Sequence, residues 1–145
     1  MNFYLLDTVS ITEIQNKDKN FFTSNFYRDN CFVPEEIVFE LESPQNEYLL
    51  DKLKKKTYPI SSEILKYLPI VMGEMNLDNV VIDLYQNKGN GDVFCLAIAF
   101  CENSKNQDKL LPDDWLIVSN DLGLAKLAKT LGVRVINSRE FELII

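Results

Sequence analysis

The sequence of 145 residues contains no histidine. This absence excludes Ser-His and Cys-His catalysis, a zinc site with imidazole ligands, and a ribonuclease that works through paired histidines. Glycine and proline are scarce, with five of each, which excludes collagen-like and linker-like chains. The three cysteines, Cys31, Cys95 and Cys101, include no C-x-x-C pair, so we expect buried, reduced thiols rather than disulfides.

The sequence also lacks a long hydrophobic run. Its longest apolar stretch, residues 93–101, is far shorter than the roughly 20 residues that cross a bilayer. The apolar run at residues 3–6 ends at Asp7 and follows no basic segment, so no signal peptide is expected. These features predict a cytoplasmic protein with no membrane partner.

Basic residues are in the minority, with 15 Lys and Arg against 22 Asp and Glu and a formal net charge of −7. This charge disfavours broad, non-specific coating of DNA, although a divalent ion can still bring a phosphate to an acidic pocket. Hydrophobic residues make up 46% of the chain, enough for one sizeable core. The length is that of a single domain, which we expect to span residues 1–145.

Strand-like and helix-like segments alternate along the chain. Short apolar runs predict strands at residues 3–6, 31–33, 58–60, 115–119 and 133–136. Helical patterns predict helices near residues 34–43, 44–56, 61–75, 79–86, 92–100 and 120–132, and a short one from Ser138. Residues 12–30 and 87–91 are predicted to be loops, the former with a helical turn or two. This alternation favours a three-layer α/β/α fold with a central parallel sheet.

Acidic residues occur at the expected ends of the buried elements. Asp7 and Asp121 each follow a predicted strand, and Asp92 begins the most apolar helix. Glu40 lies at the edge of the apolar stripe of its helix. Ligands of open parallel sheets bind outside the carboxyl ends of the strands, so these four carboxylates are candidates for one site. Four neighbouring carboxylates would raise one another's pKa, and Mg²⁺ or Mn²⁺ is the cation that oxygen-only ligands select.

Each acid also has a structural interpretation. Asp7, Asp92 and Asp121 (or Asn120) could each cap a helix, and Glu40 could be a solvated helix residue. For any single residue, capping is at least as good an explanation as metal binding. Capping does not explain why an acid ends each of these buried strands.

The order of these segments resembles a PIN domain, the metal-dependent nuclease fold of VapC-type toxins and RNA-processing enzymes. The matching segments are the first strand with Asp7, VPEEIVFEL with Glu40, GDVFCLAIAF with Asp92, and IVSNDLGL with Asp121. The closing stretch LAKLAKTLGVRVINSREF resembles the last strand and helix of such domains. Glu36 is a rival for Glu40, but the Glu-Leu pair at 40–41 fits the family pattern better.

The resemblance implies a function and a set of roles. It implies an endoribonuclease that uses Mg²⁺ or Mn²⁺ to hydrolyse RNA phosphodiesters and leaves a 5′-phosphate, and that could be the toxin of a toxin-antitoxin pair. The implied catalytic and metal ligands are Asp7, Glu40, Asp92 and Asp121. The implied supporting polar residues are Thr8, Ser119 and Asn120. An antitoxin and a second copy of the chain are the protein partners that the resemblance suggests.

Two other functions stay open. The first is a PIN-like domain that binds RNA or a protein without cutting, because Val93 stands where PIN toxins usually have a small residue and no Thr or Ser precedes Glu40. The second is a receiver-like regulator of phosphoryl transfer. Such domains group their acids after the first strand, where this chain has only Asp7, so we disfavour it.

Substrate-binding residues are not identified by the sequence. The only dense basic run, Lys52 with Lys54, Lys55 and Lys56, could contact phosphate, although a solvated helix end is the more common role. Arg28 and the neighbouring aromatic residues at 26 and 27 could stack on single-stranded bases. Packing in the core or in a dimer is the interpretation that we favour for these aromatic residues, and Trp115 is expected to be structural.

Overall fold

The computed structural model describes residues 1–74 and 90–145, and all structural statements below concern these residues. The helix predicted over residues 79–86 and most of the loop predicted over 87–91 lie outside them. Within this part of the chain, no helix is both long and apolar enough to cross a membrane.

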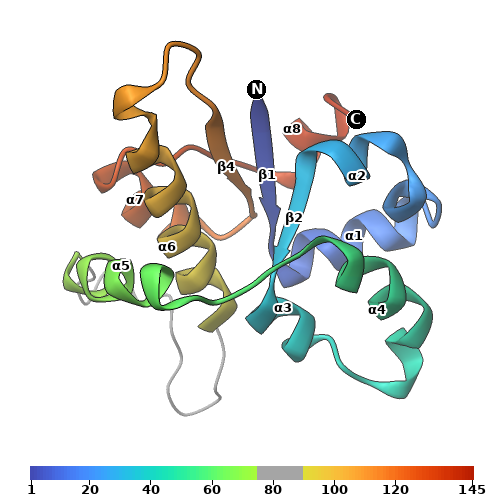
Figure 1. The fold of residues 1–145 in the computed structure, drawn as a ribbon. Helices are drawn as coiled ribbons and strands as arrows, with labels where there is room; N and C mark the ends of the chain where they lie inside the picture. The colour runs from blue at the N-terminus through green and yellow to red at the C-terminus, as the bar shows by residue number, and fades with distance from the viewer. Residues whose placement is uncertain (75–89) are drawn as a thin grey trace.

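A five-stranded parallel sheet forms the centre of the described fold (Figure 1). Its spatial order is β3-β2-β1-β4-β5, so the first strand of the chain is the middle strand of the sheet. The strands are β1 (Asn2–Leu6), β2 (Cys31–Pro34), β3 (Thr57–Tyr58), β4 (Asp114–Val118) and β5 (Val135–Ile136). All neighbouring pairs are parallel, which confirms the predicted α/β class.

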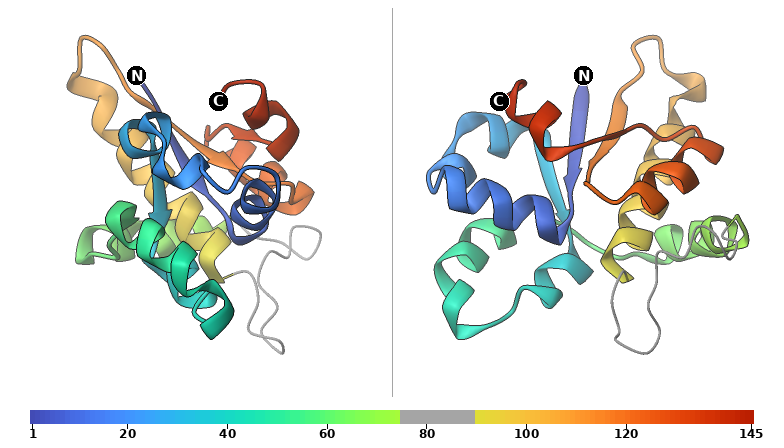
Figure 2. Two further views of the ribbon diagram at one scale, coloured as in Figure 1. Left: turned by 90° about the vertical axis from the view of Figure 1, so that its right-hand side faces the viewer. Right: turned by 180° about the vertical axis from the view of Figure 1, so that it is seen from behind.

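Helices connect and cover these strands. The α-helices are α1 (Thr8–Lys17), α2 (Asn25–Asn30), α3 (Glu35–Glu40), α4 (Glu47–Leu53), α5 (Ser62–Gly73), α6 (Asn90–Ser104), α7 (Leu122–Thr130) and α8 (Ser138–Glu142). Single 3-10 turns are η1 (Phe21–Thr23), η2 (Pro44–Asn46), η3 (Lys54–Lys56) and η5 (Lys105–Asp108). Figure 2 shows α6 on one face of the sheet, with α1, α7 and α8 on the other, which gives the predicted three layers.

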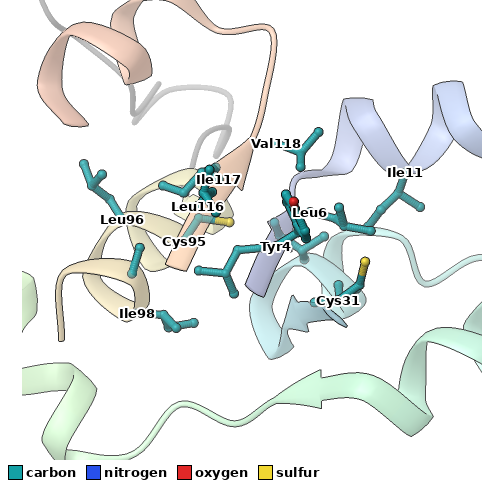
Figure 3. Close-up of a cluster of buried hydrophobic side chains, with 14 of the residues drawn as sticks. Tyr4, Leu6, Ile11, Cys31, Cys95, Leu96, Ile98, Leu116, Ile117 and Val118 are labelled. Carbon is teal, nitrogen blue, oxygen red and sulfur yellow. The ribbon is translucent and has the colours of Figure 1, made fainter. Parts of the chain in front are cut away.

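The core lies mainly between α6 and the two central strands, β1 and β4. Helix α6 is apolar on all sides because the sheet covers one flank and α5 packs along another. Figure 3 shows Cys95 of this helix next to Leu116 and Ile117 of β4. All three cysteines are buried free thiols, as the sequence predicts. Helices cover parallel sheets on both faces, so both sides of each strand are buried. This explains why the sequences of β1 and β4 are almost continuously apolar.

Residues 12–30 differ from the prediction of a loop with a helical turn or two. They contain most of α1, the turn η1 and the whole of α2. The aromatic residues Phe21, Phe22 and Tyr27 are buried, and Phe21 packs edge-on against Phe141 of α8 at a centroid distance of 5.9 Å. The segment was hard to predict because its polar residues interrupt the apolar period. Its aromatic residues serve the core, which was the favoured interpretation.

Smaller corrections concern three segments. The helix predicted near residues 34–43 is shorter, because Pro34 ends β2 and α3 spans Glu35–Glu40. The helix predicted near residues 44–56 is divided into the turn η2, the helix α4 and the turn η3. The last strand has two residues rather than four, because α7 ends in a turn that delays it until Val135.

The end of α7 follows the sequence signal closely. Gly132 has a φ of +68°, the left-handed conformation that ends helices and that glycine adopts without strain. The N–H of Val133 donates to the carbonyl of Ala128 at 3.0 Å, and the N–H of Gly132 donates to that of Lys129 at 3.3 Å. These two bonds form a Schellman motif, which turns the chain into β5.

Candidate active site

The candidate site lies where the strand order changes direction. From the central β1 the chain builds outward to β2 on one side, and later to β4 on the other. In such sheets a crevice forms outside the carboxyl ends of the two strands that flank the change. Asp7 directly follows β1, and Asp121 caps the helix after β4. Figure 1 shows α3 and the start of α6 at the same edge of the sheet.

Asp7 is a buried carboxylate, only 4% exposed. It caps α1, because its Oδ1 accepts the backbone N–H of Ser10 at 2.8 Å. Burial raises the pKa of the Asp7 carboxyl, hydrogen bonds from Ser119 and Ser10 lower it, and the charge of Asp121 raises it again. The structural interpretation of Asp7 as a helix cap is therefore correct. It is also compatible with a second role, since the cap occupies one carboxylate oxygen.

Asp121 occupies the matching position after β4 but is exposed. Its Oδ1 accepts the N–H of Leu124 at 3.0 Å, so it caps α7. The backbone N–H of Asp121 donates to the hydroxyl of Ser119 at 3.1 Å. Ser119 also hydrogen-bonds to Asp7, so its hydroxyl links the ends of the two central strands.

Asp92 lies inside the first turn of α6 rather than at its cap, because the helix begins at Asn90. Burial, followed by the charges of Asp7, Asp121 and Glu40, raises the pKa of Asp92 to about 7. The structure therefore brings the four predicted acids within electrostatic range of one another. This raised pKa is the observation that distinguishes the site from a set of independent helix caps.

Glu40 is the last residue of α3, and it is exposed. The Thr8 hydroxyl donates to its Oε2 at 2.8 Å, which connects α3 to the first residue of α1. Glu40, rather than the nearby Glu36, is among the charges that raise the pKa of Asp92. Thr8 and Ser119, both predicted as supporting residues, thus each contact one of the four acids.

The fit of this donor set to a metal ion has a chemical and a geometric part. Its ligands are all carboxylate oxygens, the type that Mg²⁺ and Mn²⁺ prefer, and a divalent cation would relieve the repulsion that raises the pKa of Asp92. In residues 1–74 and 90–145, however, no three Asp, Glu or Cys side chains are close enough to hold one ion. The four carboxylates are therefore close enough to affect the pKa of Asp92, but their oxygens do not point at one common position. One oxygen each of Asp7, Asp121 and Glu40 accepts a hydrogen bond, from Ser10, Leu124 and Thr8 respectively.

Asn120 has a structural role that the sequence did not indicate. Its side-chain Nδ2 donates to Glu13 of α1 at 3.1 Å and to the Ser138 hydroxyl at 3.0 Å. Its Oδ1 accepts the N–H of Ser138 at 3.0 Å. Asn120 therefore joins the end of β4 to α1 and α8, and it does not cap α7. Glu13 and Ser138 were missed because their relation to Asn120 depends on how distant helices pack.

Ser10 was missed as well. Its hydroxyl donates to the backbone carbonyl of Val118 at 3.0 Å, across the two central strands. The spacing Asp-x-x-Ser is a helix-cap signal that could have placed the Ser10 N–H on Asp7. Nothing in the sequence indicates the bond to Val118.

Beneath the acids lies Cys95, which is fully buried. Burial, together with the nearby charges of Asp92 and Asp7, raises the pKa of its thiol well above the usual value. A protonated, inaccessible thiol cannot act as a nucleophile or as a metal ligand. Cys95 therefore forms part of the apolar floor of the site.

Exposed apolar side chains adjoin the site residues in the sequence. Phe39 precedes Glu40 and is 68% exposed, and Leu122 follows Asp121 and is 78% exposed. Such side chains offer flat or apolar surface next to the acidic groups. They are the described features near the site that suit contact with a nucleobase.

Comparison with known proteins supports the fold. No protein-family model matches the sequence, and no curated protein matches it. Among solved structures, the fold matches a chain of VapBC2 from Rickettsia felis bound to a DNA fragment from its promoter. The TM-score is 0.54, the identity is 18%, and the match covers 94% of this chain and 98% of that chain. An identity this low shows the fold alone, and it confirms the expected PIN-like arrangement of helices around a parallel sheet.

Proposed function

We propose that this PIN-like chain is a metal-dependent endoribonuclease that hydrolyses phosphodiester bonds of RNA. The observation that carries the proposal is the position of Asp7 and Asp121 directly after the two central parallel strands, with Glu40 held beside Asp7 by Thr8. The raised pKa of Asp92, which arises from burial and from the charges of these three acids, agrees with this arrangement. Carboxyl groups whose pKa is raised by burial and by neighbouring like charges cluster at functional sites. The match to a VapBC2 chain adds fold-level support.

In this proposal Asp7 and Asp92 are the main ligands of Mg²⁺ or Mn²⁺, and Glu40 and Asp121 complete the set. When bound, such a cation supplies a nucleophilic water at neutral pH and neutralises charge that develops on the phosphate. The hydroxyl of Ser119 orients the Asp7 carboxylate, and Thr8 holds Glu40. Asn120 positions the loop after β4 through its bonds to Ser138.

Substrate contact is assigned to the apolar residues beside the acids. Bases of single-stranded RNA stack on exposed aromatic or apolar side chains, and such contacts tolerate many sequences. Phe39 of α3 and Leu122 of α7 are exposed, and each is the direct sequence neighbour of a proposed ligand, Glu40 or Asp121. We propose that Phe39 and Leu122 contact the nucleotides on either side of the cleaved bond.

The partners follow from the same likeness. VapBC2 is a complex of two kinds of chain, and by analogy the present chain is proposed to be the toxin of a toxin-antitoxin pair. A small antitoxin and a second copy of the chain are its proposed protein partners. We further propose that residues 1–145 form one domain and that the protein works in the cytoplasm.

The decisive experiment is RNA cleavage by the purified chain with and without divalent metal. We expect cleavage with Mn²⁺ or Mg²⁺, none in EDTA, and a loss of at least about 100-fold in the variants Asp7→Asn and Asp92→Asn. Asp108→Asn, an exposed acid on η5, is the matched control and should cleave normally. Full activity in EDTA, or equal loss in the control, would refute the proposal.

A second function is favoured by one observation. In the described residues no three acidic or cysteine side chains are close enough to hold an ion. A PIN-like domain that binds RNA or a protein without cutting would need no such cluster. Calorimetric titration with Mn²⁺ separates the two functions: binding that Asp92→Asn abolishes supports the nuclease, and RNA binding with no response at millimolar Mn²⁺ supports the binding domain.

A further inference from the structure

A cavity of about 370 Å³ lies between the segment η1–α2 and the segment α4–η3. Every charged side chain that lines it is basic: Arg28, Lys52, Lys55 and Lys56. Phe22 and Tyr27 contribute an aromatic wall. In a chain with a net charge of −7, this cavity gathers four cations and no acid among its lining residues. Figure 1 shows α2 and α4 on the β2 side of the sheet, away from α7.

Two of these cations are held in place by aromatic rings. The Lys52 ammonium lies 4.7 Å from the centroid of the Tyr48 ring, and that of Lys56 lies 4.0 Å from the centroid of Phe32. An aromatic ring attracts an ammonium group through its face, so the N–H donors of the ammonium stay available for an acceptor. Both charges are therefore positioned in advance and can still bind an anion.

An acidic side chain compensates part of this positive charge. Asp29 pairs with Arg28 at 2.9 Å, and both side chains are more than half exposed, so the pair is weak. Lys56 also lowers the pKa of Asp29 through its charge. Four cations against one acid leave a surplus of positive charge around the cavity.

Tyr27 contributes its ring, rather than its hydroxyl, to the wall of the cavity. The residue is 2% exposed, and its hydroxyl is covered by protein and has no hydrogen-bond partner in the described structure. A ligand in the cavity therefore meets aromatic carbon at Tyr27, which suits a planar base.

We propose that this cavity is a second binding site, distinct from the acidic pocket, for the phosphate group of a nucleotide. Its volume lies within the range of small-ligand sites, about 300–1,000 Å³. Lysine and arginine recognise phosphate, while an aromatic wall suits the planar base that accompanies it. The phosphate can belong to a free nucleotide or to an RNA strand. The site requires no metal and does not depend on the proposed nuclease activity.

The test is calorimetric titration of the full chain in EDTA, so that the acidic pocket holds no metal. The probes are uridine 5′-monophosphate, uridine, a short oligouridylate and an acidic peptide of poly-glutamate. We expect both phosphate-bearing probes to bind, uridine to bind at least roughly tenfold more weakly, and affinity to fall as salt rises. Tighter binding of the oligouridylate identifies a strand as the source, and equal binding identifies the free nucleotide.

Variants localise the binding. Lys52→Gln with Lys55→Gln should weaken binding of uridine 5′-monophosphate by at least roughly tenfold. The matched control removes two exposed lysines elsewhere, Lys66→Gln with Lys126→Gln, and should leave binding unchanged. The single variant Arg28→Gln, at an exposed position, provides a check if the double variant fails to fold.

Several results would overturn the proposal. The first is equal affinity for uridine 5′-monophosphate and uridine. The second is an equal loss of affinity in the cavity and control variants. The third is tighter binding of the acidic peptide than of either phosphate-bearing probe. Tyr27→Phe is a further control. It should neither change phosphate binding nor lower the melting temperature, because the lost hydroxyl is covered by protein and has no partner within it.

Discussion

The acidic pocket and the basic cavity are built in different ways. The four acids come from positions 7, 40, 92 and 121, and the parallel sheet brings them to one edge. The cations come from two short segments, residues 22–28 and 52–56, which become neighbours because their helices pack together. The comparison teaches that a site at strand ends follows from topology, whereas a site between helices depends on packing that no sequence period encodes.

The two regions also differ in how charge is balanced. Burial, together with the like charges of three other acids, raises the pKa of Asp92 to about 7, and none of the groups that shift it is a cation. The basic cavity includes an ion pair with Asp29 and two ammonium groups on aromatic rings. The acidic site therefore holds repulsion that a bound cation would relieve, while the basic cavity keeps a surplus of positive charge that one acid, Asp29, offsets only in part.

The largest expected difference between the regions is their response to pH. Because the pKa of Asp92 is higher in the folded than in the unfolded chain, the folded state holds more protons between about pH 4 and pH 7. The free energy of unfolding of the metal-free protein should therefore fall as pH rises through this window, by up to about 4 kcal/mol. Asp92→Asn should flatten this dependence. Urea titrations at several pH values measure it, and an unchanged slope in the variant would contradict the charge coupling.

The second-largest expected difference between the two regions is the effect of their variants on stabilisation by Mn²⁺. If Mn²⁺ binds only the folded state, a concentration of 100 times the dissociation constant stabilises the protein by about 2.7 kcal/mol. Thermal melts should show this gain in the wild type and in Lys52→Gln, but not in Asp7→Asn. Asparagine keeps the helix cap and removes the charge, so a loss there reports on metal rather than on folding. Equal stabilisation of Asp7→Asn would remove Asp7 from the ligand set.

Thr8 offers a smaller and more local test. Its hydroxyl holds Glu40, and partners of this kind typically change metal affinity by about 10- to 100-fold. We expect Thr8→Val to weaken Mn²⁺ binding toward the lower end of this range in calorimetry. Thr12→Val, which removes a hydroxyl bonded to the Thr8 carbonyl within the same helix, is the control. Similar losses in both variants would assign the effect to α1 as a whole.

The smallest effect is expected in the basic cavity. Tyr27→Phe removes a buried hydroxyl that has no partner in the described structure, so the free energy of unfolding should stay the same or rise by about 1 kcal/mol. Chemical denaturation measures the change. A clear loss of stability would show that the hydroxyl has a hydrogen-bond partner in solution.

Much of the fold was readable from the sequence, for identifiable reasons. The apolar runs of β1 and β4 and the uniformly apolar α6 indicate burial directly, and Gly132 marks the end of α7. The segment at residues 12–30 was not readable in the same way. Its aromatic residues are buried by contacts with α8, more than a hundred positions later in the chain, and no local pattern reveals such contacts.

The sequence by itself determined the kinds of chemistry open to this protein. Without histidine, and without paired cysteines, it can build only an oxygen-ligand metal site, and its acids stand where buried strands end. Tertiary structure alone decided which groups interact: it coupled Asp92 to three distant acids, tied Asn120 to Ser138, and gathered cations around Tyr27. The physical reason is that burial and proximity set both pKa values and hydrogen bonds, and both arise only when distant segments pack.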